Sequence, residues 1–181
     1  MRTSPQSAPE PQVIAEEPAG DPLLTGVLDR WTDQGLTGEP WPFMILASVG
    51  RLHQYLKKAL DGELKQRGLT RTGYFLLTTL ALTSTGRTRL STLSRLVMMH
   101  PTSVKLTVDQ LETAGLVRRT PHPSDRRATL VELTDAGRAT AAAVNRALEE
   151  PDGPFAALGG LRRELFEALQ PARLAVGDTE L

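Results

Sequence analysis

The sequence contains no cysteine, few aromatic residues and no surplus of charge of either sign. With no cysteine among 181 residues, disulfide bonds, zinc–thiolate sites and thiol-based peroxide sensing are excluded within this chain. Aromatic residues make up 4% of the chain and hydrophobic residues 40%, which favours packed aliphatic helices over an aromatic-lined catalytic cleft. The length is sufficient for one domain with a sizeable core.

Long apolar segments, a secretion signal and catalytic motifs are also missing. No apolar stretch is long enough to cross a membrane and the N-terminus lacks the order of a signal peptide, so we expect a cytoplasmic protein. The three histidines, His53, His100 and His122, have no neighbours at metal-ligand spacing. Glycine-rich phosphate loops and a nucleophile elbow are absent. We therefore expect no catalysis, no metal and no cofactor.

The zero net charge conceals an uneven distribution along the chain. Residues 87–128 contain eight basic and three acidic side chains, a local charge of plus five. Residues 1–40 contain two basic and seven acidic side chains, a local charge of minus five. The basic segment favours a polyanionic partner, because its charge coincides with helix punctuation rather than being scattered.

The basic segment begins with two consecutive helix patterns. In the first, Ser91 precedes apolar residues that recur at helical spacing as far as Val97, so we expect Ser91 to cap a short supporting helix. In the second, Pro101 suits the first turn, where a missing amide proton costs no hydrogen bond, and His100 marks the helix start. Two helices in this order are typical of a helix-turn-helix.

The second of these helices has two chemically different faces. Its apolar face, which we expect in the core, consists of Val104, Val108 and Leu111. The opposite face carries short or basic side chains, which leave room for a base edge or a phosphate. The residues that we assign to this face are Thr102, Ser103, Lys105, Thr107 and Asp109. This composition predicts a recognition helix for double-stranded DNA.

A β hairpin is predicted after Gly115, from two short segments that favour strands, 117–120 and 129–133. Two prolines between the segments fix backbone angles and remove amide donors, which indicates a protruding tip. We expect Arg126 and Arg127 at this tip to enter a narrow minor groove, where the electrostatic potential is most negative.

Two more polar residues complete the winged pattern. Asp125 stands beside the two arginines, and we expect it to orient one guanidinium through paired hydrogen bonds. Thr134 is expected to cap a new helix, with Asp135 near its positive end.

In this order, the residues resemble the MarR family of bacterial transcription regulators. The resemblance is carried by Gly115-Leu116-Val117 followed by Arg119, by Asp125 with Arg127, and by Leu133-Thr134 followed by Gly137-Arg138. It covers residue 43 to the last helix and implies a mainly α-helical protein with a small β wing. It also implies a triangular homodimer whose N- and C-terminal helices form the dimerisation region. Such proteins usually repress transcription from palindromic sites and are often released by a small aromatic or anionic ligand.

The recognition helix departs from the common family pattern at two positions. Many relatives have Arg or Asn where Leu106 sits, and an apolar residue where Thr107 sits. Base specificity therefore cannot be carried over from relatives, whereas phosphate-facing residues and wing arginines are retained. The predicted DNA contacts are Arg89, Ser91, Pro101, Thr102, Ser103, Lys105, Thr107, Arg119, Asp125, Arg126 and Arg127.

The chain is predicted to have four parts. These are a disordered tail (1–20), N-terminal dimerisation helices (21–69), a winged helix-turn-helix domain (70–138) and C-terminal dimerisation helices (139–181). Outside the helix-turn-helix, the pattern predicts helices over 22–35, 42–67, 70–82, 134–150 and 155–169.

Four side chains are candidates for a ligand pocket: Trp41, His53, Tyr55 and Tyr74. A phenolic or carboxylate ligand requires an apolar wall with a few polar groups. For Trp31 and Trp41, packing at a dimer interface is favoured over ligand contact, because large aromatic residues dominate interface packing. His53 shares a helical stripe with apolar residues, and a core histidine with satisfied hydrogen bonds is the favoured interpretation.

Three functions remain open from the sequence. The leading hypothesis is a homodimeric repressor that binds double-stranded DNA at a palindromic operator and is released by a small aromatic or phenolic ligand. The alternative is a winged-helix module that docks other proteins, although such a module has no need of a basic wing tip beside a helix face of small residues. A small hydrolase or transferase would require a catalytic constellation that the sequence lacks.

Overall fold

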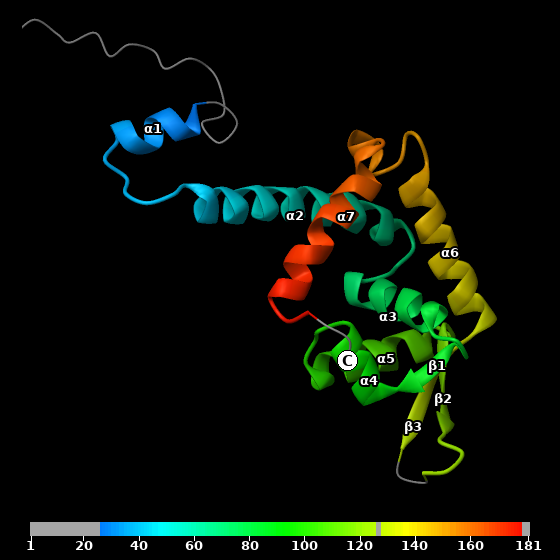
Figure 1. Ribbon diagram of the computed structural model, residues 1–181. Coiled ribbons are helices and arrows are strands. Elements are labelled where there is room, and N and C mark those ends of the chain that lie inside the picture. Colours follow the sequence, from blue (N-terminus) through cyan, green and yellow to red (C-terminus); the bar gives the residue numbers. More distant parts are fainter. Residues whose placement is uncertain (1–25, 126–127, 179–181) are drawn as a thin grey trace, which may run out of the picture. The chain divides into compact units, whose positions relative to one another are not determined.

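The computed structural model describes residues 26–125 and 128–178 (Figure 1). Its elements, in chain order, are α1 (Val27–Asp33), α2 (Trp41–Gln66), α3 (Arg71–Leu82), β1 (Arg87–Arg89), α4 (Leu90–Leu96), α5 (Pro101–Thr113), β2 (Val117–Pro121), β3 (Thr129–Leu133), α6 (Asp135–Glu149), the short 3-10 helix η1 (Ala156–Leu158) and α7 (Leu161–Ala175). The mainly helical fold with a small β wing is therefore confirmed. The predicted tail (1–20), the first residues of the predicted helix 22–35, and both wing-tip arginines lie outside the described residues.

The chain divides into two compact units, Met1–Leu52 and His53–Leu181. In the first unit, the indole of Trp31 donates a hydrogen bond to the carbonyl of Gly38 at 3.0 Å. Its ring lies 5.9 Å from the ring of Phe43, measured between centroids. These contacts join α1 to the start of α2, where most apolar side chains nevertheless stay exposed.

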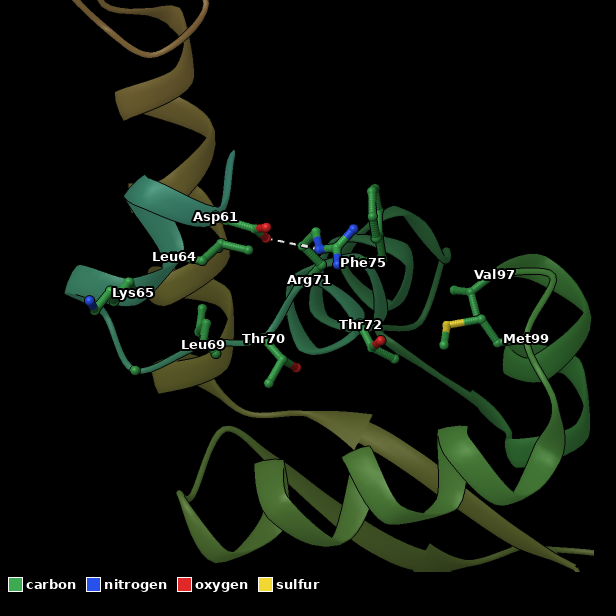
Figure 2. A pocket seen from close by; sticks show the side chains of 11 residues that line it. Asp61, Leu64, Lys65, Leu69, Thr70, Arg71, Thr72, Phe75, Val97 and Met99 are labelled. Atoms are coloured by element: carbon green, nitrogen blue, oxygen red, sulfur yellow. Dashed lines mark ion pairs between the residues drawn. The ribbon is translucent and has the colours of Figure 1, made fainter. Parts of the chain in front are cut away.

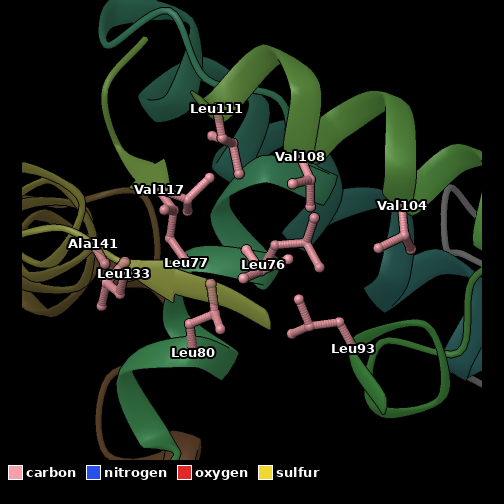
Figure 3. Close-up of a cluster of buried hydrophobic side chains, with 11 residues drawn as sticks. Leu76, Leu77, Leu80, Leu93, Val104, Val108, Leu111, Val117, Leu133 and Ala141 are labelled. Atoms are coloured by element: carbon pink, nitrogen blue, oxygen red, sulfur yellow. The ribbon is translucent and has the colours of Figure 1, made fainter. Parts of the chain in front are cut away.

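The core of the second unit forms where α3, α4 and α5 meet the sheet (Figure 3). The side chains that converge there are Leu76, Leu77, Leu80, Leu93, Val104, Val108, Leu111, Val117, Val131, Leu133 and Ala141. The predicted apolar face of α5 is confirmed, since its three residues belong to this cluster. A smaller cluster joins the end of α2 to α3 and α6 through Leu60, Leu64, Tyr74, Val144 and Leu148.

The sheet has three antiparallel strands in the order β1-β3-β2. Both predicted strands of the hairpin are confirmed, with Val117 opposite Leu133 and Pro121 opposite Thr129. The third strand, β1, pairs Arg87 with Glu132 and was not predicted from the sequence. Its three polar residues have no apolar alternation, and only pairing with β3 makes them a strand.

Side-chain caps hold the starts of three helices in the second unit. Thr70 and Thr134 accept hydrogen bonds at 3.0 Å from the amides of Gly73 and Gly137, respectively. At the start of α5, the imidazole Nδ1 of His100 accepts from the Thr102 amide at 3.3 Å. The predicted helices over 70–82 and 134–150 and the Pro101 start are confirmed, and so is the long helix over 42–67, within one residue.

Two expectations about helix ends are wrong. Ser91 does not cap α4, because β1 ends at Arg89 and the helix begins at Leu90, which places Ser91 inside the first turn. The last helix begins at Leu161 rather than residue 155, because Gly159 adopts φ 47° after η1 and thereby ends the helical conformation there. It then continues through Pro171 to Ala175 instead of ending at residue 169.

No helix in the described part of the chain combines the length and the apolar character needed to cross a bilayer. The same residues contain no group of three His, Asp or Glu side chains arranged to hold a metal ion.

Candidate nucleic-acid interface

Helix α5 turns its apolar side into the core and presents polar side chains to solvent. Val104 and Val108 are fully buried, whereas Thr102, Ser103 and Lys105 are exposed, as predicted. Because the inward face is fixed by core packing and the first turn by the His100 cap, the outward face is rigidly oriented. Such a face can approach a base edge without reorganising.

Thr107 is not on this exposed face, which corrects the sequence-based assignment. It is buried, and its hydroxyl donates to the carbonyl of Ser103 at 3.0 Å. It lies three residues after Val104 and four before Leu111, so helical geometry places it on the core side. Leu106 is instead exposed, with 60% of its surface accessible. The exposed face of α5 therefore includes Leu106 but not Thr107.

The wing is an ordered hairpin as far as the described residues extend. The His122 amide donates to the Ala128 carbonyl at 3.1 Å, and the Ala128 amide donates to the Asp125 carbonyl at 3.0 Å. The Ser124 amide donates to Nδ1 of His122 at 3.3 Å. These bonds hold the described residues that flank the tip, whereas Arg126 and Arg127 lie outside the described residues.

Asp125 reaches across to β1. One of its carboxylate oxygens lies 3.5 Å from Nη2 of Arg89, and the same guanidinium nitrogen is 3.4 Å from Nε2 of His122. The sequence predicts that Asp125 orients one of the two adjacent arginines, and that Arg89 contacts DNA. The structure brings Arg89 and Asp125 together at the wing.

Arg119 is engaged with two acidic side chains of α5. Its Nη2 donates to Oδ1 of Asp109 at 2.5 Å, and its Nη1 donates to Oε2 of Glu112. Its backbone amide also donates to Oε1 of Glu112 at 3.0 Å. Burial alone would lower the pKa of Arg119, but the hydrogen bonds and charges of both carboxylates outweigh it and raise the pKa. The role of Glu112 could not be predicted from the sequence, because a pair seven residues apart across a turn has no periodic signal.

A second ion pair lies within the sheet. Nη2 of Arg118 donates to Oε1 of Glu132 at 2.7 Å, between the neighbouring strands β2 and β3. This hydrogen bond, followed by the charge of its partner, raises the pKa of Arg118, and the hydrogen bond from Arg118 lowers the pKa of Glu132. Unlike Arg119, neither side chain of this pair forms a hydrogen bond or an ion pair with a described residue of α5.

The four candidate ligand residues differ in burial. Trp41, His53 and Tyr55 are exposed, so the interpretation of His53 as a core histidine is wrong for the single chain. Tyr74 is buried, and its hydroxyl donates to Oδ1 of Asn145 at 2.6 Å. Burial raises the pKa of Tyr74, so the group stays a neutral phenol at physiological pH.

A hollow of about 780 Å³ opens at the joint between α2 and α3 (Figure 2). Apolar side chains from four segments line it: Leu64, Leu69, Phe75, Val97 and Met99. Lys65 and Arg71 add positive charge, and Nε of Arg71 lies 2.8 Å from Oδ1 of Asp61. The four predicted ligand residues are not among its lining. No sequence pattern marks it, because its walls come from segments more than thirty residues apart.

Known proteins resemble this chain in fold and in sequence. Residues 69–129 match the model of the MarR family. Sco5413, a MarR family transcriptional regulator from Streptomyces coelicolor, is 34% identical, covers 80% of this chain with 100% of its own, and superposes with a TM-score of 0.68. AbsC from the same organism is 27% identical, with 78% of this chain and 95% of its own covered and a TM-score of 0.59. The HTH-type transcriptional regulator PecS of Dickeya dadantii (strain 3937) is 26% identical over 130 residues, which span 70% of this chain and 75% of PecS. Together with the winged helix-turn-helix geometry, these likenesses show that the chain belongs to the MarR family of transcriptional regulators, which are DNA-binding regulators rather than enzymes.

Proposed function

We propose that this regulator is a homodimeric repressor that binds a palindromic operator, with α5 in the major groove and the wing in the adjacent minor groove. We assign dimerisation to residues 21–69 and 139–181 and DNA binding to residues 70–138. The observation that carries the proposal is the exposed polar face of α5, held rigidly beside a hairpin in the most basic part of the chain.

The contacts of α5 divide by chemistry. Thr102 and Ser103 are exposed in its first turn, where hydroxyl groups and the positive end of the helix suit a phosphate or a base acceptor. Lys105 is exposed one turn further and supplies a full positive charge. Pro101 has no amide proton to donate, so it is proposed to contact DNA only through the apolar surface of its ring. Leu106 adds an apolar surface that suits the methyl group of thymine.

The wing supplies the sequence-independent part of the affinity. Arg126 and Arg127 are proposed to enter the minor groove, and Arg89, half exposed beside Asp125, to approach the phosphate backbone. Ser91, exposed in the first turn of α4, is close enough in sequence to Arg89 to join the same backbone contact.

Dimerisation is supported by apolar side chains that a single chain leaves in water. None of the residues of α7 is buried, although the helix carries Leu161, Phe166, Leu169 and Leu174. In the first unit, the exposed apolar residues are Leu28, Leu36, Trp41, Phe43, Ile45, Leu46 and Val49. Exposed surface of this kind marks an interaction site, and a second copy of the chain is the partner that a two-fold operator requires.

A small aromatic or anionic ligand is proposed to occupy the hollow at the α2–α3 joint, rather than the region of His53 and Tyr74. Arg71 and Lys65 suit an anionic group, and Phe75 provides part of an apolar wall. Val97 and Met99, which line the hollow, immediately precede the start of α5, so a ligand there can bias the recognition helix. By reciprocity, a ligand that weakens DNA binding must itself bind more weakly to the DNA complex.

The test begins with selection of operator duplexes from a random library by the full chain, followed by light scattering of the free protein. We expect selected sequences to be inverted repeats and the protein to be a dimer. Failure to enrich any duplex would favour the alternative of a protein-docking module, and a stable monomer at micromolar concentration would contradict the dimer.

Repression and ligand release need their own measurements. A reporter promoter carrying the selected duplex should be silenced by the protein, and activation instead would contradict the repressor assignment. Benzoate and phenol serve as probes of the hollow, with the Arg71→Gln variant as control. We expect benzoate to weaken operator binding by the wild type more than by the variant, and an equal response of both proteins would contradict this site.

A further inference from the structure

The recognition helix and the wing are fastened together by an ion cluster on the outside of the domain. Arg119 on β2 reaches both Asp109 and Glu112 on α5, through different guanidinium nitrogens. Glu112 accepts from the side chain of Arg119 with one oxygen and from its backbone amide with the other. The carboxylate therefore fixes the strand itself, and not only the end of a flexible side chain.

The chain segment that joins α5 to β2 is short. Only three residues separate α5 from β2, and Gly115 among them adopts φ 71°. The Leu116 amide donates to the Leu111 carbonyl at 2.9 Å, which closes the turn. Leu111 and Val117 are both buried in the core on either side of it. The ion cluster thus links α5 to β2 at the protein surface, and the buried side chains of Leu111 and Val117 link the same two elements in the core.

The charges of this cluster are unexpected for a surface that meets DNA. Two carboxylates and one guanidinium leave a local charge of minus one close to the proposed interface. Both carboxylates engage Arg119, whose side chain is only 28% exposed, so it has little free positive charge to offer a phosphate. An arginine that contacts the phosphate backbone of DNA is expected to have no carboxylate partner within the protein.

Resting on the proposed function, we propose that Arg119, Asp109 and Glu112 form a positioning clasp that sets the angle of the wing relative to α5. Arg119 is thereby a positioning residue, in place of the direct DNA contact predicted from the sequence. The clasp makes the two elements approach DNA as one rigid body, so that base reading by α5 and groove contacts by the wing occur together. Rigid placement of contacting groups is what converts individual contacts into specific affinity.

The sign of a charge change tests the clasp. Removing a negative charge beside a polyanion raises affinity if electrostatics alone operates. We expect the opposite for Glu112→Gln and Asp109→Asn, each of which should weaken binding to the selected operator about fivefold to tenfold. The slope of affinity against salt should also become shallower, because wing contacts with phosphates are lost.

Glu132→Gln is the matched control. It removes the same charge and breaks an ion pair that also involves β2, but this pair lies between β2 and β3, and neither of its side chains forms a hydrogen bond or an ion pair with a described residue of α5. We expect operator affinity of this variant to be unchanged or higher. If Glu112→Gln and Asp109→Asn behave like Glu132→Gln, the clasp is refuted.

A second pair of variants separates position from charge at Arg119 itself. Arg119→Lys keeps the positive charge but cannot hold two carboxylates with a planar fork, so operator binding should fall as it does in Arg119→Ala. Full binding by Arg119→Lys would show that charge alone suffices and would overturn the proposal. Circular dichroism confirms that each variant is folded at the assay temperature. If the wild type enriches no duplex, the proposed function is refuted. If the wild type enriches an operator but the affinities of the variants follow their charge alone, only the clasp is refuted.

Discussion

Gly137 offers a sharp test of how the wing docks on the following helix. A Cβ atom at this position would lie 2.0 Å from the carbonyl oxygen of Leu116 and 2.8 Å from Cδ1 of Leu133. The same carbonyl accepts a hydrogen bond from the Thr134 amide at 3.2 Å. An alanine must therefore push the start of α6 away from the turn before β2, and it must break or lengthen this bond.

The magnitude for Gly137→Ala follows from two contributions. Overpacking costs about 1–3 kcal/mol, and loss of the hydrogen bond between Thr134 and Leu116 about 1 kcal/mol. The free energy of unfolding should thus fall by about 2–4 kcal/mol. For a chain of this size, each kcal/mol lowers the melting temperature by about 2–4 °C, so the total decrease is roughly 5–15 °C.

Gly62→Ala provides the matched control, because it makes the same replacement in the interior of α2. A Cβ there would meet nothing within 4 Å. Alanine should raise the free energy of unfolding by about 0.5–1 kcal/mol through its higher helix propensity. Thermal denaturation followed by circular dichroism, at equal protein concentration, measures both variants. A Gly137→Ala protein that melts at or above the wild-type temperature would refute the docking geometry.

Three further predictions concern the helix-turn-helix and the wing. Met98 adopts φ 51° and is 80% exposed at the end of α4, so Met98→Gly should relieve strain and stabilise the fold by up to about 1 kcal/mol in a thermal melt, whereas destabilisation would contradict the strained turn. Arg118→Ala should raise the pKa of Glu132 in an NMR titration, because the hydrogen bond from Arg118 lowers it. The depressed pKa also means that the pair stabilises the fold above the ordinary glutamate pKa and that this contribution disappears as the pH falls through the folded value, so an unchanged titration would disprove the pairing. Arg127→Ala should weaken binding to all duplexes and make its salt dependence shallower, and a variant with wild-type affinity and slope would show that the wing does not contact DNA.

Local chemistry predicted those parts of the fold that depend on neighbouring residues. Thr134 and Pro101 mark helix starts through interactions within one turn, and both were placed correctly from the sequence. Val104, Val108 and Leu111 identify a core face, because helical periodicity is itself a local property. Extending the same spacing would have moved Thr107 to that face, where its hydroxyl is satisfied by the Ser103 carbonyl.

Features that depend on distant pairing could not be obtained in this way. Strand β1 exists because Arg87 and its neighbours pair with β3, more than forty residues later. Arg119 belongs to a basic segment by composition, yet its charge is taken up by Asp109 and Glu112 of the preceding helix. The hollow beside Arg71 is likewise formed by segments that only the tertiary fold brings together. The candidate DNA-binding face could therefore be predicted from the sequence, but the ion pairs that join α5 to the wing could not.

The central claim is that two copies of α5 read successive major grooves on one side of the duplex. A hydroxyl-radical footprint of the full chain on a selected operator tests it most directly. Two symmetric protected regions should lie about 10 base pairs apart, centre to centre, on the same face of the helix. A single protected region, or protection without two-fold symmetry, would contradict the account.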